Sequence, residues 1–283
     1  MPEISVIVTT FNRAHMVSQT INSILAQTCE DFELIIVDNE SVDNTEKVIT
    51  SYSDKRLRYF KNPNNGIVAV NRNFGIQQSQ GTYIAFCDDD DLWLPDKLER
   101  QLTEFNRDSY VGMVCSNAIN FDDKRQYGNR IKPKLDDRDF TFEALIHSSR
   151  IILSTVITQR EVLNDVGSFD ISPEIFSGED YELWLRIAYE YKIKYVNSPL
   201  IKYRTHLGGF SQDRDYIKRL GITEAVYRKL IEKDILSSDL YQKAIKRRKL
   251  NVRIKTILRY NWVTTLVERI FRSPIKWSRS ITK

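Results

Sequence analysis

The sequence predicts an α/β fold, with helices on both faces of a mostly parallel sheet and a helical C-terminal extension. Short apolar strands alternate with helical segments over residues 4–118, at the spacing typical of parallel β–α–β units. The first strand, residues 4–9, is too rich in β-branched residues for a sheet with one solvated face, so both faces should be covered. From about residue 213 onward the pattern is helical.

The elements of the first half follow from apolar periodicity and from the turn residues between apolar runs. After the first strand, Val17, Ile21 and Ile24 recur at helical spacing. The turn-rich residues 62–66 separate the third strand from the next helix. The expected strands are 4–9, 32–37, 57–61, 83–87 and 111–118, and the helices expected after the first one are 43–52, 68–79 and 97–107.

The second half carries a weaker pattern. Residues 120–139 are polar and lack a core periodicity, which predicts an excursion loop. Residues 168–179 are expected to be irregular. The expected helices are 140–148, 160–166 and 180–190, and the expected strands are 154–158 and, around Asn197-Ser198-Pro199, 192–204.

Length and composition limit the class of protein. A chain of 283 residues with 41% hydrophobic residues can form one large domain with appendages or two small domains. It lacks a run of about 18 apolar residues, so we expect no helix that spans a membrane, and the N-terminus has a strand pattern rather than that of a signal peptide. Cys29, Cys87 and Cys115 are widely spaced and odd in number, which favours buried thiols in a reducing cytoplasm over disulfides or a zinc site.

Charge is distributed unevenly along the chain. The overall net charge is +4. Residues 243–283 hold 13 Lys or Arg residues against one acidic residue, Glu268, whereas residues 1–242 carry a net charge of about −8. Such asymmetry indicates an anionic surface as partner. Within this tail, Val263, Leu266 and Ile270 belong to an apolar helical stripe.

A basic amphipathic helix of this kind fits the surface of an anionic membrane. Alternatively, the stripe packs on the rest of the chain or on a second copy of it in a homo-oligomer. Nucleic acid is not expected as a partner, because no recognisable nucleic-acid-binding module accompanies the basic residues. On the membrane interpretation, a chain cut after about Asp239 should stay folded.

The apolar strand at residues 83–87 runs directly into four carboxylates, Asp88, Asp89, Asp90 and Asp91. Adjacent like charges repel, and a cation would offset that cost. Hard oxygen ligands favour Mg²⁺ or Mn²⁺, ions that usually complete their shell with water and substrate phosphates. The alternative, a solvated acidic turn, fits poorly between an apolar strand and Leu-Trp-Leu-Pro.

Three polar clusters, residues 9–13, 38–41 and 88–91, follow expected strands. Ligands of open parallel sheets bind beyond the carboxyl ends of the strands, so these clusters should share one crevice. The first strand is not followed by Gly-x-Gly-x-x-Gly, and no Gly-x-x-x-x-Gly-Lys occurs, so dinucleotide and P-loop sites lack support.

Together these segments resemble the family 2 glycosyltransferases of the GT-A fold, an inverting group that uses nucleotide sugars. The resemblance implies a Rossmann-like catalytic domain over residues 1–212, with a nucleotide-binding half to about 118 and an acceptor half from about 119, followed by the basic extension 213–283. The matching segments are SVIVTTFNR from Ser5, VDNESVDNT from Val37, Asn65-Gly66 with Asn71-Arg72-Asn73, the acidic run, and Gly178-Glu179-Asp180.

The resemblance assigns a nucleotide pocket to the first two clusters. Thr9 would supply a hydroxyl, Phe11 a ring to stack on the base, and Asp38 a carboxylate; the alternative for Phe11 is core packing. At the position after Asp38 the family often has a second Asp, which accepts a hydrogen bond from a uracil N–H. Here that position is Asn39, whose amide oxygen can still accept a hydrogen bond. Glu40 replaces the usual Gly, so UDP is favoured while dTDP and GDP stay open.

The acidic run resembles the family's Asp-x-Asp motif. Asp88 and Asp89 would contact ribose or metal-bound water, and Asp90 would ligate Mn²⁺ or Mg²⁺. Asp91 is expected to cap the turn before Leu92-Trp93. His206 could approach the diphosphate or the metal from the far side, although a lone His is often structural.

Two further segments complete the site implied by the resemblance. Arg72 resembles the arginine that faces the nucleotide; alternatively, it only pairs with Asp38 or Asp88. Asp180, at the start of an apolar-faced helix, resembles the base that deprotonates the acceptor hydroxyl, and the alternative is an ordinary N-cap. Glu179 would bind the donor sugar or the acceptor.

These expectations describe a metal-dependent inverting glycosyltransferase, cytoplasmic and peripheral to the inner face of a bacterial membrane. It would transfer a sugar from a nucleotide-diphosphate sugar to a hydroxyl of a glycan or lipid-linked acceptor in polysaccharide or lipopolysaccharide synthesis. A nucleotidyltransferase that makes sugar nucleotides should carry a Gly-rich basic loop after the first strand, which is absent. A non-catalytic nucleotide- or nucleic-acid-binding protein should lack a base such as Asp180.

Overall fold

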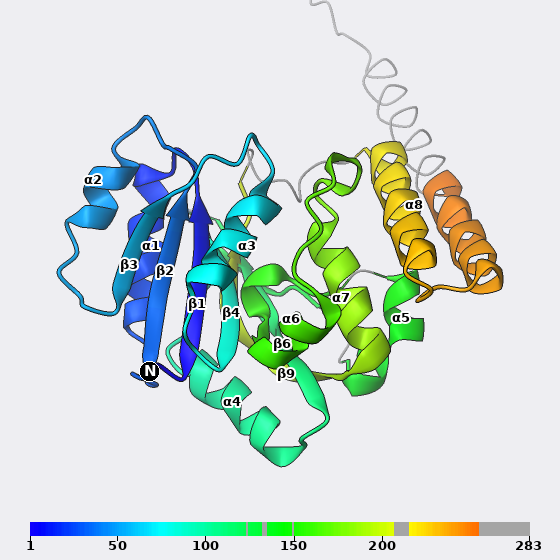
Figure 1. The fold of residues 1–283 in the computed structure, drawn as a ribbon, viewed down its shortest axis with the longest axis horizontal. Helices are drawn as coiled ribbons and strands as arrows, with labels where there is room; N and C mark the ends of the chain where they lie inside the picture. Colours follow the sequence, from blue (N-terminus) through cyan, green and yellow to red (C-terminus); the bar gives the residue numbers. More distant parts are fainter. Residues whose placement is uncertain (123, 132–134, 149, 207–214, 255–283) are drawn as a thin grey trace, which may run out of the picture.

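A computed structural model describes residues 1–122, 124–131, 135–148, 150–206 and 215–254. In the described part of the chain, one nine-stranded sheet has the order β3-β2-β1-β4-β8-β6-β9-β5, with β7 added to β6. Figure 1 shows β3, β2, β1 and β4 side by side in this order. The strands are β1 (Ile4–Thr10), β2 (Phe32–Asp38), β3 (Leu57–Lys61), β4 (Tyr83–Asp88), β5 (Leu92–Trp93), β6 (Val111–Phe121), β7 (Gln126–Asn129), β8 (Ile157–Gln159) and β9 (Lys192–Arg204).

Eight helices with defined bounds accompany the sheet among the described residues, and residues 238–254 are also helical. Short 3₁₀ turns occur at Asp137–Phe140, Leu153–Thr155 and Pro173–Ile175. The helices are α1 (Ala14–Leu25), α2 (Thr45–Thr50), α3 (Val68–Gln78), α4 (Lys97–Arg107), α5 (Phe142–His147), α6 (Arg160–Val166), α7 (Glu179–Glu190) and α8 (Tyr216–Glu232).

The first four strands in the sheet order pair in parallel, which brings their carboxyl ends to one edge. Thr10 is in register with Asp38, and Thr9 with Asp88. The three polar clusters of the sequence therefore meet beyond this edge, as predicted. The expected fold class is confirmed. The sheet also contains β8, β5 and β7, which pair antiparallel with their neighbours.

Both faces of the sheet are covered, as the apolar first strand predicted. Val6 and Val8 point into one core with α1 and α4, whereas Ile7 points into the other core with α3. Helix α3 approaches closely, because a Cβ added at Gly75 would lie 2.5 Å from a methyl carbon of Ile7.

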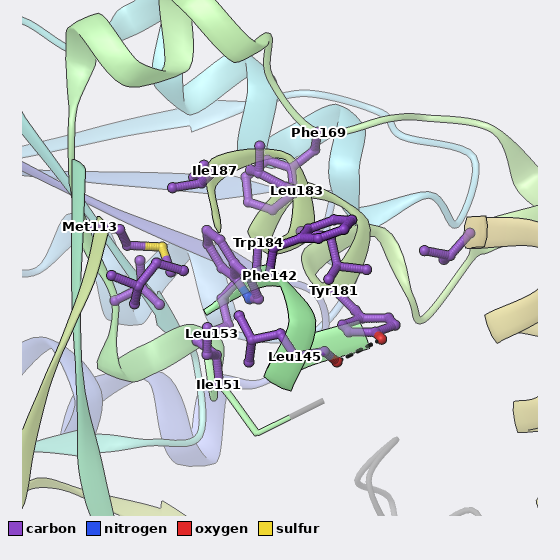
Figure 2. Close-up of a cluster of buried hydrophobic side chains, with 14 of the residues drawn as sticks. Met113, Phe142, Leu145, Ile151, Leu153, Phe169, Tyr181, Leu183, Trp184 and Ile187 are labelled. Carbon is purple, nitrogen blue, oxygen red and sulfur yellow. Dashed lines mark hydrogen bonds between the residues drawn. The ribbon is translucent and has the colours of Figure 1, made fainter. Parts of the chain in front are cut away.

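The larger core continues into the C-terminal helices. Trp184 of α7 is fully buried in this cluster (Figure 2). Its ring lies 6.4 Å from that of Phe86 on β4. Tyr227 of α8 and, further along the chain, Ala244 and Ile245 belong to the same cluster and are buried. The described part of the extension therefore packs on the sheet-bearing part through a shared core.

One expectation needs revision, and another concerns residues outside the described part of the chain. Residues 120–139 contain the strand β7, which carries no apolar periodicity because all its residues are exposed. The apolar stripe from Val263 lies outside the described residues, whereas Leu250 and Ile254 before it are exposed. Along the described chain, no helix combines the length and apolarity needed to cross a bilayer.

Candidate active site

The end of β1 contributes a hydroxyl and an exposed ring to the crevice. Thr10, the neighbour of the expected Thr9, donates from Oγ1 to Asp89 Oδ2 over 2.6 Å. Phe11 is 50% exposed, so the alternative that it packs in the core is wrong. The Arg13 side chain, which the sequence did not single out, has Nε 3.9 Å from Asp89 Oδ1.

Asp38, at the end of β2, is fully buried and hydrogen-bonded on both carboxylate oxygens. One oxygen accepts from the backbone N–H and hydroxyl of Ser41, over 3.0 and 2.6 Å, and the other accepts from the Tyr59 hydroxyl over 2.7 Å. Burial and this hydrogen bond raise the pKa of Tyr59. Both carboxylate oxygens of Asp38 therefore already accept from the protein, and Asp38 shapes the edge of the crevice.

Asn39 differs from the expectation in one respect. Its amide oxygen already accepts a hydrogen bond of 2.8 Å from the Asn64 backbone N–H, in the loop before α3. Its own backbone N–H donates to the Thr10 carbonyl oxygen over 3.0 Å. The oxygen that we expected to be available to a nucleobase therefore holds two loops of the crevice together.

Arg72 on α3 links three elements. Its Nη1 lies 2.6 Å from Glu179 Oε1 on α7, and its Nη2 lies 3.3 Å from Asp88 Oδ1 at the end of β4. Of the two expected ion pairs, the structure contains the one with Asp88. Arg72 Nε and Glu179 Oε2 are buried, and neither has a hydrogen-bond partner among the described residues.

Asp180 lies in the first turn of α7, where the helix N-terminus favours negative charge. Gly178 occupies the N-cap position, so the alternative that Asp180 is the N-cap is wrong. Its Oδ1 accepts from the Tyr181 backbone N–H over 2.6 Å. Burial first, and then the charge of Glu179, raise the pKa of Asp180 to about 7. A carboxyl group with this pKa is suited to general base catalysis near neutral pH.

The acidic run consists of two buried carboxylates, Asp89 and Asp91, and two half-buried ones, Asp88 and Asp90. Asp91 is fully buried and accepts from Ser154 Oγ over 2.5 Å and from the Arg204 backbone N–H over 2.9 Å, so it anchors the turn to two other segments. Burial raises the pKa of Asp89 to about 7, and it also raises the pKa of Asp88 against the opposing charge of Arg72. The neighbouring charge of Asp90 also raises the pKa of both groups, so the crevice has a surplus of negative charge.

A cation fits this surplus and the donor atoms beside it. Asp90 Oδ2 lies 2.8 Å from His206 Nε2, a carboxylate and an imidazole that together suit Mn²⁺. Arg204 Nε donates to the Asp90 carbonyl oxygen over 2.8 Å and fixes the backbone there. Among the described residues no three His, Cys, Asp or Glu side chains form a ready-made metal site, so an ion here would need water or substrate oxygens as well.

The chain is similar to known proteins over most of its length. The profile described as Glycosyl transferase family 2 matches residues 5–167. The Escherichia coli UDP-Glc:alpha-D-GlcNAc-diphosphoundecaprenol beta-1,3-glucosyltransferase WfgD is 29% identical over 213 residues, which cover 75% of this chain and 80% of WfgD. An uncharacterised glycosyltransferase of Rickettsia conorii is 34% identical over 205 residues, which are 71% of this chain but 33% of that protein.

Solved structures share the fold at low sequence identity. Staphylococcus aureus TarS 1–349 in complex with UDP-GlcNAc has a TM-score of 0.69 at 18% identity, over 87% of this chain and 72% of that one. The Pyrobaculum calidifontis mannosyltransferase PcManGT in complex with GDP-Man and Mn²⁺ has a TM-score of 0.64 at 18% identity, over 87% and 68%.

Proposed function

Because the chain belongs to glycosyl transferase family 2 and has the GT-A fold, we propose that it is an inverting, metal-dependent glycosyltransferase with Asp180 as its base. The observation that carries this proposal is a carboxyl group with a pKa raised to about 7, beside the Arg72–Glu179 pair. A base and a candidate cation site in one crevice are what a transfer from a nucleotide-diphosphate sugar requires.

In the proposed reaction Asp180 takes the proton of an acceptor hydroxyl. The hydroxyl oxygen attacks the anomeric carbon, and the bond to the diphosphate breaks on the opposite side. Arg72 holds the Glu179 carboxylate toward α3, and the free Glu179 Oε2 accepts a hydrogen bond from a sugar hydroxyl. This contact orients either the donor sugar or the acceptor.

The nucleotide lies over the ends of β1, β2 and β4 in this proposal. Phe11 stacks on the base, Thr9 supplies a hydroxyl, and Asp88 and Asp89 contact ribose or metal-bound water. Asp38 and Asn39 act indirectly, because their side chains brace the loops around the pocket. UDP is the favoured nucleotide, since the name of WfgD specifies UDP-Glc and TarS is complexed with UDP-GlcNAc.

Asp90 and His206 would hold the Mn²⁺ or Mg²⁺ ion. A bound ion would supply positive charge to the diphosphate oxygens as the nucleotide departs. The Mn²⁺ in the PcManGT complex supports a divalent cation at such a site.

The acceptor in this proposal is a lipid-linked glycan at the inner face of a bacterial membrane, in polysaccharide or lipopolysaccharide synthesis. The name of WfgD specifies a diphosphoundecaprenol-linked sugar, which supports that class of acceptor. The basic tail would bring the crevice to an anionic membrane surface.

A donor screen tests the proposal. Full-length protein is incubated with Mn²⁺ and each of UDP-glucose, UDP-GlcNAc, dTDP-glucose and GDP-mannose, and release of nucleoside diphosphate is measured. Release from one donor, lost in Asp180→Asn, is the expected result. Release of pyrophosphate from nucleoside triphosphate and sugar phosphate would instead support the nucleotidyltransferase alternative.

A further inference from the structure

Arg248 lies in the helical residues 238–254 and reaches from the extension onto the catalytic part of the chain. Its Nη2 lies 2.8 Å from the Tyr181 hydroxyl and 3.3 Å from the Ile146 carbonyl oxygen. Its Nε donates to the Tyr227 hydroxyl over 3.0 Å. The guanidinium thus connects α7, α8 and the end of α5 through three polar contacts.

Within the described residues Arg248 forms no ion pair with a carboxylate, although its guanidinium lies 5.4 and 5.9 Å from the ring centres of Tyr181 and Tyr227. Placing a cation in such surroundings has a desolvation cost that hydrogen bonds must offset. A methionine would fill similar volume without this cost. The arrangement therefore needs an explanation beyond packing of the helix.

Tyr181 links this contact to the candidate base. It directly follows Asp180, and its backbone N–H donates to the Asp180 carboxylate over 2.6 Å. At the other end of the same residue, the buried hydroxyl lies 2.9 Å from the Leu145 carbonyl oxygen, the contact drawn in Figure 2. Since a hydroxyl donates only one proton, it donates to a carbonyl and accepts from Arg248.

We propose that Arg248 is a positioning residue, which fixes Asp180 through Tyr181 and makes catalysis depend on docking of the C-terminal helix. The proposal rests on the proposed function, because it takes Asp180 as the base. Tyr181 is held at its hydroxyl by Arg248 and at its backbone by α7, so a shift of the ring displaces the N–H that orients the carboxylate. The docked helix contains residues 243–254 of the basic tail, so this part of the tail and the placement of the base share one structural element.

The test compares Arg248→Met and Tyr181→Phe with Lys246→Met, which changes an exposed residue of the same helix. Nucleoside diphosphate release from the donor identified in the screen is measured with Mn²⁺ and without lipid. We expect kcat to fall about 10- to 100-fold in both test variants, the range for a misplaced catalytic group, while KM for the donor stays within about twofold. Lys246→Met should match wild type.

A double-mutant cycle separates positioning from general support of the fold. If Arg248 acts through Asp180, then Arg248→Met should cause no further loss of kcat in the Asp180→Asn background. An equal loss in both backgrounds, or an unchanged kcat in Tyr181→Phe that keeps its wild-type Tm, would overturn the proposal. The proposed function fails separately, if Asp180→Asn alone keeps wild-type turnover.

Discussion

Arg72 and Glu179 form a buried ion pair, with 2.6 Å between Nη1 and Oε1, across 107 positions of sequence. The pair joins α3, which packs on β1, to the first turn of α7, which carries Asp180. Because Arg72 also contacts Asp88, one guanidinium connects the end of β4 with the turn that holds the candidate base.

Removal of the charge of Glu179 should destabilise the fold. Glu179→Gln leaves Arg72 with Asp88 as its remaining ion-pair partner among the described residues. Loss of one member of a buried pair costs about 3 kcal/mol or more of unfolding free energy. Urea denaturation measures the change. Glu174→Gln is the matched control, since Glu174 contacts Lys229 at the surface and its loss should cost less than about 1 kcal/mol. Equal effects in the two variants would contradict burial of the Arg72 pair.

Binding of nucleotide should depend on the metal. Nucleoside diphosphate should raise Tm only in the presence of Mn²⁺ or Mg²⁺, and Asp90→Ala should abolish this synergy because it removes a ligand. Asp96→Ala, a change at an exposed carboxylate that pairs with Arg100, serves as control. Stabilisation by nucleotide that is equally large in EDTA argues against a metal bridge.

Asp180→Asn should separate chemistry from binding. The amide cannot take a proton, so turnover should fall about 10²- to 10⁴-fold, the usual contribution of a positioned base, while donor affinity changes little. Titration with nucleotide sugar measures the affinity. The control is Glu190→Gln, at the exposed end of the same helix. More than about a tenth of wild-type turnover in Asp180→Asn would rule out Asp180 as the base.

The rate should increase with pH through the titration of Asp180. Burial and the charges of Glu179 and Asp88 raise the pKa of this carboxyl to about 7, while Arg72 lowers it. Only the deprotonated form accepts a proton, so kcat/KM should rise about tenfold per pH unit below 7 and level off above it. Neutralisation of Glu179 in Glu179→Gln removes the largest charge that raises this pKa, and the midpoint should move to lower pH. A flat profile between pH 5 and 8 would contradict the assignment.

The tail should bind anionic membranes. Ala244 and Ile245 are buried, so a truncation meant to keep the fold belongs after Ile254 rather than after Asp239. Removal of residues 255–283, which contain seven basic residues and one acidic residue, should abolish sedimentation with anionic liposomes and leave donor hydrolysis unchanged. Full-length protein that ignores such liposomes at low salt would refute the membrane interpretation. A changed oligomeric state of the truncated protein would support the homo-oligomer alternative.

Local signals made most of the fold predictable. Helices α4 and α6 and the strand β3 have the bounds that the periodicity gave, because each is bordered by clear turn or charge signals. The acidic run was selected because adjacent carboxylates after an apolar strand suit a divalent cation, and Asp180 and His206 were selected through the family resemblance; their roles stay predictions.

Contacts between distant segments could not be predicted in the same way. Tyr59 beside Asp38, and Arg248 beside Tyr181, join residues that no periodicity or motif relates. The occupied oxygen of Asn39 also depends on a loop conformation that places the Asn64 N–H beside it. Such partners emerge only from tertiary packing.

The register of β1 has a consequence for how the protein folds. Its pairings with β2 and β4 join positions 28 and 79 residues apart, Ile4 with Phe32 and Thr9 with Asp88. Distant parallel pairings form slowly. During synthesis the first two strands are therefore available long before the acidic run can complete the crevice. A ligand that needs the ends of β1, β2 and β4 together would bind late in folding, and it would favour the fully paired sheet over partly assembled intermediates.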